Sequence, residues 1–181
     1  MTSKKDYRLI PAVLEQSLSK DWSLAVHEWM IRDCTEDPEC ATQCICGKEG
    51  IRYLFSIKNI KNGNVLFPIG SSCIKKFERS DLTEQVCVYE KLFKLTNEFS
   101  KSTYIPFTSD FFSKKLLTFL YNQGAFKPSS FNHGQPIRDY KFLLKMFNKR
   151  TPPSTAQKSK INAIIIHSIV PYLKSKLYNQ V

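Results

Sequence analysis

The sequence predicts an α+β protein in which an antiparallel β-hairpin module is followed by a basic helical module. Two short β-rich segments flank the dipeptide Asn62-Gly63, and a cysteine-glycine corner stands on either side of them. Beyond residue 80 the apolar residues recur at helical spacing, and lysine becomes frequent while acidic residues become rare. We therefore expect one module over residues 1–80 and a second, all-helical module over residues 81–181.

The first module begins with a predicted helix, because Pro11 stands in the first turn of the apolar segment 9–18. Trp29-Met30-Ile31 predicts a strand that leads into an acidic loop from Asp33 to Glu39. This loop is expected to be solvated, with a cation or a basic partner as the alternatives. The hairpin itself is predicted over residues 52–58 and 65–69, because Asn-Gly tolerates the positive φ of a tight turn. Pro68 cannot donate a ladder hydrogen bond, which favours an edge position for the second strand.

The cysteines next to this hairpin predict a metal site. Cys44-Ile45-Cys46-Gly47 precedes the hairpin, and Gly70-Ser71-Ser72-Cys73 follows it. A glycine beside a thiolate lets backbone amides point at sulfur, as in a zinc knuckle. A tetrahedral zinc ion needs a fourth ligand, for which Cys40 is preferred and Cys34 is the alternative. The first module is therefore expected to resemble a zinc ribbon, with structural zinc bound by Cys40, Cys44, Cys46 and Cys73.

Two other interpretations of the cysteines remain open at this point. The spacing departs from the usual pairing of two CxxC motifs, and free cysteines are often simply buried. Disulfides are the other possibility, but the first six residues contain no apolar signal segment, so we expect a reducing cytoplasm. Cys87 lies within a helical pattern and is expected only to pack in the core.

Helix signals continue through the second module. Asp81 is a candidate cap and Glu84 a capping-box partner for a helix over residues 82–100. Ser109 is expected to cap a helix over 110–122 that Gly124 ends, and residues 125–137 predict a loop. A further helix is predicted over 139–149, followed by a last helix that starts after Ser154 or Thr155. Pro171 is expected to break or restart that last helix.

The positive charge of the chain lies in its second half. Residues 1–90 contain 12 Lys and Arg against 13 Asp and Glu, whereas residues 91–181 contain 15 against 3. The net charge of +11 is therefore −1 in the first half and +12 in the second. Such a surface favours phosphate backbones or acidic protein surfaces, the alternative being a lysine-rich surface that serves solubility.

Several of these cations are expected to lie on one side of the helix over 139–149. Arg138, Lys141, Lys145 and Lys149 fall within a sector of about 80° on a helix, and the apolar residues take the other side. Arg150, Lys158 and Lys160 extend the charge. Four to six phosphate contacts would give a salt slope of about −4 to −5 on duplex DNA. The stripe lacks Asn and Gln residues that read bases, so we expect binding by shape or charge.

The sequence favours a binding protein over an enzyme. His27, His133 and His167 are scattered and have no spacing typical of a catalytic triad or a metallohydrolase. No apolar run is long enough to span a membrane.

The chain also resembles a family of small proteins carried by phages and plasmids of low-GC Gram-positive bacteria. The resemblance lies in the cysteine corners, in Tyr53-Leu54-Phe55, Asn59 and Asn62-Gly63, and in residues 69–77, 146–150, Gln157 and Lys160. It implies a protein of the bacterial cytoplasm that acts as an anti-CRISPR inhibitor. Such a protein binds a type II RNA-guided nuclease or its guide complex without catalysis and blocks DNA binding or cleavage. The alternative is a DNA-binding accessory protein of phage or plasmid replication or regulation. Besides the nuclease complex, DNA or RNA is a candidate direct partner.

Overall fold

The computed structural model describes residues 6–102 and 104–178 and divides the chain into two compact units, residues 1–90 and 91–181. The α+β prediction is confirmed. The boundary falls inside helix α4 (Ser80–Lys101), whereas the sequence placed it at the start of that helix. The first half of α4 belongs to the first unit because the ring of Tyr89 meets that of Phe55 edge-on, with centroids 5.9 Å apart. The carboxylate of Glu90 also lies 3.8 Å from the ammonium of Lys75.

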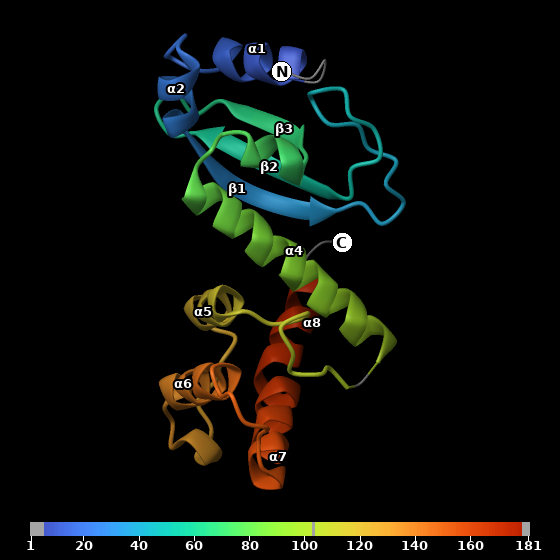
Figure 1. Ribbon diagram of the computed structural model, residues 1–181, viewed down its shortest axis with the longest axis vertical. Coiled ribbons are helices and arrows are strands. Elements are labelled where there is room, and N and C mark those ends of the chain that lie inside the picture. The colour runs from blue at the N-terminus through green and yellow to red at the C-terminus, as the bar shows by residue number, and fades with distance from the viewer. Residues whose placement is uncertain (1–5, 103, 179–181) are drawn as a thin grey trace. The chain divides into compact units, whose positions relative to one another are not determined.

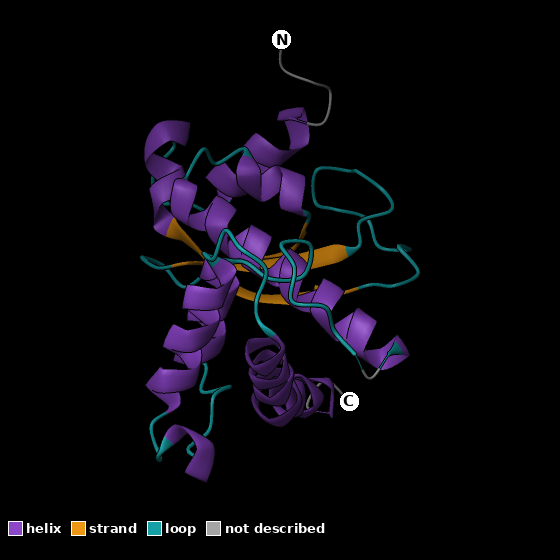
Figure 2. Ribbon diagram, turned by 60° about the horizontal axis from the view of Figure 1, so that its bottom comes forward, coloured by secondary structure: helices purple, strands orange, loops and turns teal. Residues whose placement is uncertain are grey.

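The first unit contains a three-stranded antiparallel sheet, with strand order β1-β2-β3 (Figures 1 and 2). The strands are β1 (Trp29–Glu36), β2 (Tyr53–Asn59) and β3 (Val65–Ile69). The predicted hairpin is therefore confirmed, and β3 is an edge strand as Pro68 indicated. Side chains at Ile31 and Phe55 are buried whereas those at Met30 and Lys58 are exposed, so one face of the sheet forms the core.

We expected the acidic segment from Asp33 to Glu39 to be a loop, but residues 33–36 form the second half of β1, and only residues 37–39 lie in the turn that follows. Cys34 pairs with Phe55 and Glu36 with Tyr53 across the sheet, after a shift of register between Ile31 and Asp33. The Glu36 carboxylate accepts a 2.7 Å hydrogen bond from the Nε of Arg52. These partners belong to the same unit, so the acidic segment serves the fold.

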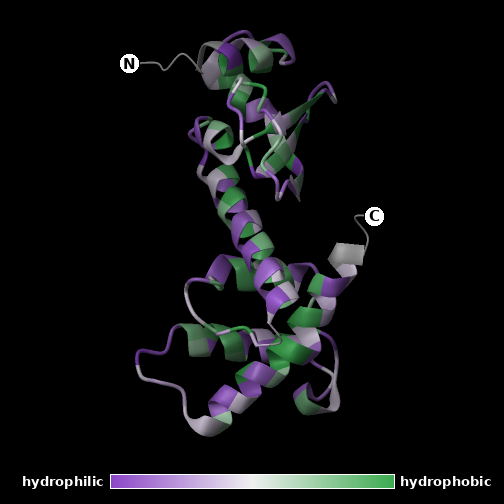
Figure 3. Cartoon of the chain, turned by 90° about the vertical axis from the view of Figure 1, so that its right-hand side faces the viewer, coloured by the Kyte–Doolittle hydropathy of each residue, from purple (hydrophilic) through white to green (hydrophobic). Residues whose placement is uncertain are grey.

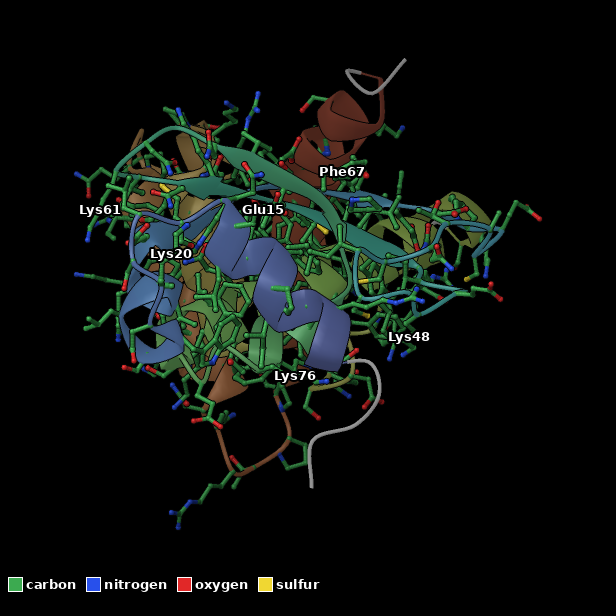
Figure 4. The ribbon with its side chains drawn as sticks, turned by 90° about the horizontal axis from the view of Figure 1, so that it is seen from above. Glu15, Lys20, Lys48, Lys61, Phe67 and Lys76 are labelled. Atoms are coloured by element: carbon green, nitrogen blue, oxygen red, sulfur yellow. The ribbon has the colours of Figure 1, made fainter. Side chains whose placement is uncertain are left out.

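The helices of this unit are α1 (Asp6–Glu15), α2 (Trp22–Ala25), the 3₁₀ helix η1 (Val26–Glu28) and α3 (Ser71–Lys75). The C-terminal end of α1 is capped by Lys20, whose ammonium donates to the carbonyl oxygens of Leu14 and Ser17 at 2.9 and 3.0 Å. Figure 4 shows Lys20 beside this end of the helix. Unsatisfied carbonyls at a helix C-terminus favour a cation there.

A buried carboxylate joins the segment after α1 to the sheet. The side chain of Glu28 has no exposed surface. Its oxygens accept hydrogen bonds from the backbone N–H groups of Leu18 and Ser19 and from the amide of Asn59, at 2.7 to 2.9 Å. Burial alone would raise the pKa of Glu28. The hydrogen bonds and the positive charge of Lys61 outweigh this effect and lower the pKa from 4.5 to about 2.

Replacing Glu28 with glutamine is expected to destabilise the first unit and to change its response to acid. A carboxylate whose pKa is lowered on folding stabilises the protein above about pH 4.5, and this contribution is lost as the pH falls toward 2. The Glu28→Gln variant should therefore have a lower unfolding temperature than the parent at pH 7. As the pH falls from 5 to 3, its unfolding temperature should decrease less steeply than that of the parent. Circular dichroism melts across this pH range measure both effects. Glu49→Gln, which alters an exposed side chain, is the control and should follow the parent.

The second unit is helical, and its helices carry hydrophobic and hydrophilic residues on different sides (Figure 3). It contains the end of α4, α5 (Lys114–Asn122), η2 (Ser130–Asn132), α6 (Pro136–Phe147), α7 (Thr155–Ile164), a π-helical turn η3 (Ile165–Ile169) and α8 (Val170–Tyr178). The predicted positions of these helices are confirmed in outline, although the starts of α4, α5 and α6 differ from the prediction.

Three helix starts differ from prediction for identifiable reasons. Ser113, not Ser109, caps α5, because its hydroxyl accepts a 3.1 Å hydrogen bond from the N–H of Leu116. The Asp81 carboxylate pairs with Arg79 at 2.6 Å, and α4 already begins at Ser80. Pro136 occupies the first position of α6, where its missing N–H costs nothing.

Two further helix signals, at Ser154 and Pro171, concern the last helices of the chain. Of the two predicted caps, Ser154 and Thr155, it is Ser154 that caps α7, and it forms a capping box with Gln157 that was not predicted from the sequence. Pro171 does not end the helical path: the π-helical turn precedes it and α8 restarts around it.

Candidate functional site

Cys44, Cys46 and Cys73 meet in the first unit and could hold a metal ion. All three side chains are buried, and their sulfur atoms lie within 4.8 Å of one another. Cys44 and Cys46 come from the turn before β2, and Cys73 comes from α3, which directly follows β3. The hairpin between the two corners therefore brings together residues that are 29 positions apart in the chain.

The backbone around Cys44 forms a tight turn that is fixed to β3. The N–H of Gly47 donates to the carbonyl of Cys44 at 2.7 Å, and Gly47 has φ of +82°, which favours glycine. The N–H of Ile45 donates to the carbonyl of Pro68 at 3.0 Å. The N–H of Gly70 points at the Cys44 sulfur, 3.4 Å away. This is the amide-to-sulfur arrangement that the cysteine-glycine corners predicted.

The same contacts favour the thiolate at Cys44. A hydrogen bond from the thiol of Cys73, together with the backbone N–H groups of Cys46 and Gly70, lowers the pKa of Cys44 to about 5. The hydrogen bond to Cys44 and burial raise the pKa of Cys73. A bound cation would displace the thiol protons of this group, since a thiolate is the form that binds metal.

The spacing of the Cys44 and Cys73 sulfurs fits a tetrahedral thiolate site. With Zn–S bonds of about 2.3 Å, two sulfurs at tetrahedral angles lie about 3.8 Å apart. The Cys44 and Cys73 sulfurs are 3.7 Å apart, and all three residues are free cysteines that form no disulfide. Three buried sulfur donors without an acidic residue in the group are a donor set for a soft or borderline metal.

The structure does not bring the predicted fourth ligand into this group. Among the described residues the group consists of Cys44, Cys46 and Cys73, and Cys40 lies outside it. Cys40 adopts a positive φ of +52°, and its sulfur faces the carbonyl of Pro38 at 3.9 Å. The alternative, Cys34, is buried in β1, and burial raises the pKa of its thiol. Cys87 is exposed on α4, so the expectation that it packs in the core is wrong.

A second candidate site is a basic hollow in the second unit. It has a volume of about 420 Å³, and its lining combines four cations with a histidine and two aromatic rings. The lining residues are Phe131, His133, Arg138, Lys141, Phe142, Lys145 and Lys160. We call this hollow the basic groove.

The geometry of the basic groove follows from α6 and α7. Arg138, Lys141 and Lys145 lie on the exposed side of α6, while Leu143 and Met146 are buried on its other side. The ammonium of Lys160, from α7, lies 4.7 Å from the centre of the Phe142 ring in a cation–π contact. None of the described residues that line the groove is acidic. The groove therefore presents positive charge and aromatic surface together.

Three of the predicted cations lie elsewhere. Lys149 donates to the carbonyl of Pro152 at 3.3 Å and to the side chain of Gln157 at 2.9 Å, so it closes the connection between α6 and α7. Lys158 lines a separate hollow of about 280 Å³. Arg150 is exposed and is not among the residues that line the groove.

Sequence reasoning missed the aromatic part of the groove. Phe131 and His133 belong to a segment predicted as a plain loop, and Phe142 lies within the cationic side of α6. The one available signal was the phenylalanine of Ser130-Phe131-Asn132, an apolar residue among turn-forming ones.

In comparisons with known proteins, no family model, curated protein or solved structure matches the chain. In the part of the chain that the structure describes, no helix has the length and apolar character needed to cross a membrane.

Proposed function

We propose that this is a non-catalytic nucleic-acid-binding protein whose second unit contacts the phosphate backbone through the basic groove. The observation that carries the proposal is the lining of the groove, where Arg138, Lys141, Lys145 and Lys160 converge without an acidic neighbour among the described lining residues. Cations on rigid helices attract phosphates and release condensed counterions when they bind. The aromatic rings add surfaces on which bases can stack.

The first unit serves this function as a metal-stabilised scaffold. We propose zinc on Cys44, Cys46 and Cys73, supported by the sulfur donor set and the 3.7 Å spacing. The fourth position of the ion is then open to water or to a ligand from outside the group. Zinc would hold the turn at Cys44 against α3 and thereby close the end of the hairpin.

The proposal is tested by the salt dependence of nucleic-acid binding. If each of the four cations meets one phosphate, the slope of log K against log salt is about −3.6 on duplex DNA and about −2.8 on a single strand. Fluorescence anisotropy with labelled oligonucleotides at several salt concentrations measures these slopes. Absence of binding to both forms at about 50 mM salt would rule out the proposed function.

Inhibition of an RNA-guided nuclease is a narrower form of the same proposal, and it rests on the resemblance. Such an enzyme is a nucleoprotein, and the basic groove would then contact its guide RNA or compete with its DNA. A type II effector incubated with excess protein before addition of DNA should lose cleavage. Full cleavage by several effectors would rule out nuclease inhibition, but it would not contradict direct nucleic-acid binding.

A further inference from the structure

Phe131 occupies an unusual position at the edge of two hollows. Its side chain is 89% exposed, although phenylalanine normally lies in the core. One hollow is the basic groove, and the other has a volume of about 680 Å³ and is lined by Phe131, Lys160 and the apolar residues Pro128, Ala163 and Ile164, among others. We call the second hollow the apolar pocket. Its volume is in the range of pockets that bind small ligands.

The loop that carries Phe131 is firmly held. The Ser129 hydroxyl accepts from the N–H of Asn132, and the Asn132 side-chain oxygen accepts from the N–H of Ser129, which makes a capping box. The amide of Asn132, which is 1% exposed, also donates to the carbonyl of Lys127 at 2.9 Å and to the Asp139 carboxylate at 2.7 Å. Asp139 belongs to α6, so the loop is fixed to the helix that carries the groove cations. The ring of Phe131 is thus presented to solvent by a loop whose hydrogen bonds do not involve it.

This combination matches the chemistry of an unpaired nucleobase beside its own backbone. A base has an apolar face that stacks on an aromatic ring, and its phosphate is anionic. The apolar pocket also contains polar groups at its wall, among them Asp139, His167 and Ser168, that can meet the polar edge of a base. The Asp139 carboxylate can accept a hydrogen bond from a base but would not favour a phosphate, so the phosphates are expected in the basic groove. In a duplex the bases are stacked and paired, so they cannot reach a pocket without being extruded.

We infer that an unpaired base stacks on Phe131 and enters the apolar pocket while neighbouring phosphates lie in the basic groove, which makes single-stranded nucleic acid the preferred ligand. This inference rests on the proposed function and narrows it from nucleic acid in general to single strands. Phe131 is the specificity-determining residue, because the groove cations alone attract either form.

The test compares a labelled oligothymidylate with a duplex of equal length, using the full chain at one salt concentration. Phe131→Leu keeps an apolar side chain but removes the aromatic face, and Phe131→Trp keeps and enlarges that face. We expect Phe131→Leu to weaken single-strand binding about tenfold or more, with duplex binding unchanged, and Phe131→Trp to bind at least as tightly as the parent. Fluorescence of 2-aminopurine placed in the single strand should be quenched by the parent and much less by Phe131→Leu.

The Lys141→Glu/Lys145→Glu variant distinguishes failure of this inference from failure of the proposed function. If that variant loses binding to both forms while Phe131→Leu binds the single strand as the parent does, the inference is overturned and the groove remains a phosphate site. Equal affinity of the parent for both forms, with no quenching, likewise overturns it. If the parent binds neither form, the proposed function fails, and the inference fails with it.

Discussion

Replacing Cys44 with serine is expected to remove the metal and unfold the first unit. The pKa of Cys44 is lowered to about 5, and its sulfur contacts both Cys73 and the N–H of Gly70. A structural zinc ion contributes on the order of 10 kcal/mol to folding, which is comparable with the whole stability of a small domain. The bound metal, measured by elemental analysis, should fall from about one ion per chain to none, with loss of cooperative melting in the first unit.

Cys87→Ser is the matched control for this experiment. It makes the same chemical change at an exposed cysteine of α4 that lies outside the cluster. It should retain the parental metal content and melting temperature. Cys40→Ser then decides the fourth ligand: retention of metal agrees with the three-cysteine group, and loss would return Cys40 to the ligand set. A Cys44→Ser protein as stable as the parent would show that the cysteines are only buried side chains.

Reversing the charge of Lys141 and Lys145 should have the largest effect on binding. Both residues line the basic groove and are exposed on α6, so the substitutions leave the core intact. Loss of two phosphate contacts lowers the duplex salt slope from about −3.6 to about −1.8 and weakens binding roughly 60-fold at about 0.1 M salt. Repulsion from the new carboxylates adds to this loss. Anisotropy titrations over a range of salt concentrations give both numbers.

The control for this variant has the same net charge and an intact groove. Lys48→Glu/Lys58→Glu changes two exposed lysines of the first unit. We expect the slope of this control to stay close to the parental value. An equal loss of nucleic-acid affinity in the two variants would mean that net charge, and not the groove, determines binding.

The sequence predicted those parts of the fold that depend on local signals. The hairpin around Asn62-Gly63, the edge position of Pro68 and the cap at Ser154 each follow from the chemistry of one or two residues, and the structure confirms them. The hairpin connection is longer than a tight turn, since it spans residues 60–64, and Gly63 but not Asn62 has a positive φ. The failures arise where tertiary contacts decide. Residues 33–36 of the acidic segment form a strand because β2 offers a partner. Ser113 caps α5 in place of Ser109, although both side chains can accept the same hydrogen bond.

The residues of the candidate sites also divide into those that local sequence signals predicted and those whose positions depend on tertiary contacts. Cys44, Cys46 and Cys73 were predictable because each lies next to or near a glycine corner, whereas the exclusion of Cys40 depends on the path of the turn between β1 and β2. Helical periodicity placed the three cations of α6 on one side. It could not show that Phe131 would be held beside them, because the hydrogen bonds of Asn132 join residues from a loop and a helix.

The central claim is that the basic groove is the surface that contacts nucleic acid. An NMR titration of the isotope-labelled protein with a short oligonucleotide tests it most directly, because each backbone amide reports its own surroundings. The account predicts that shifts concentrate on residues 131–145 and on Lys160, and grow smaller as salt is added. Shifts confined to the first unit, or spread evenly over every exposed lysine, would contradict it.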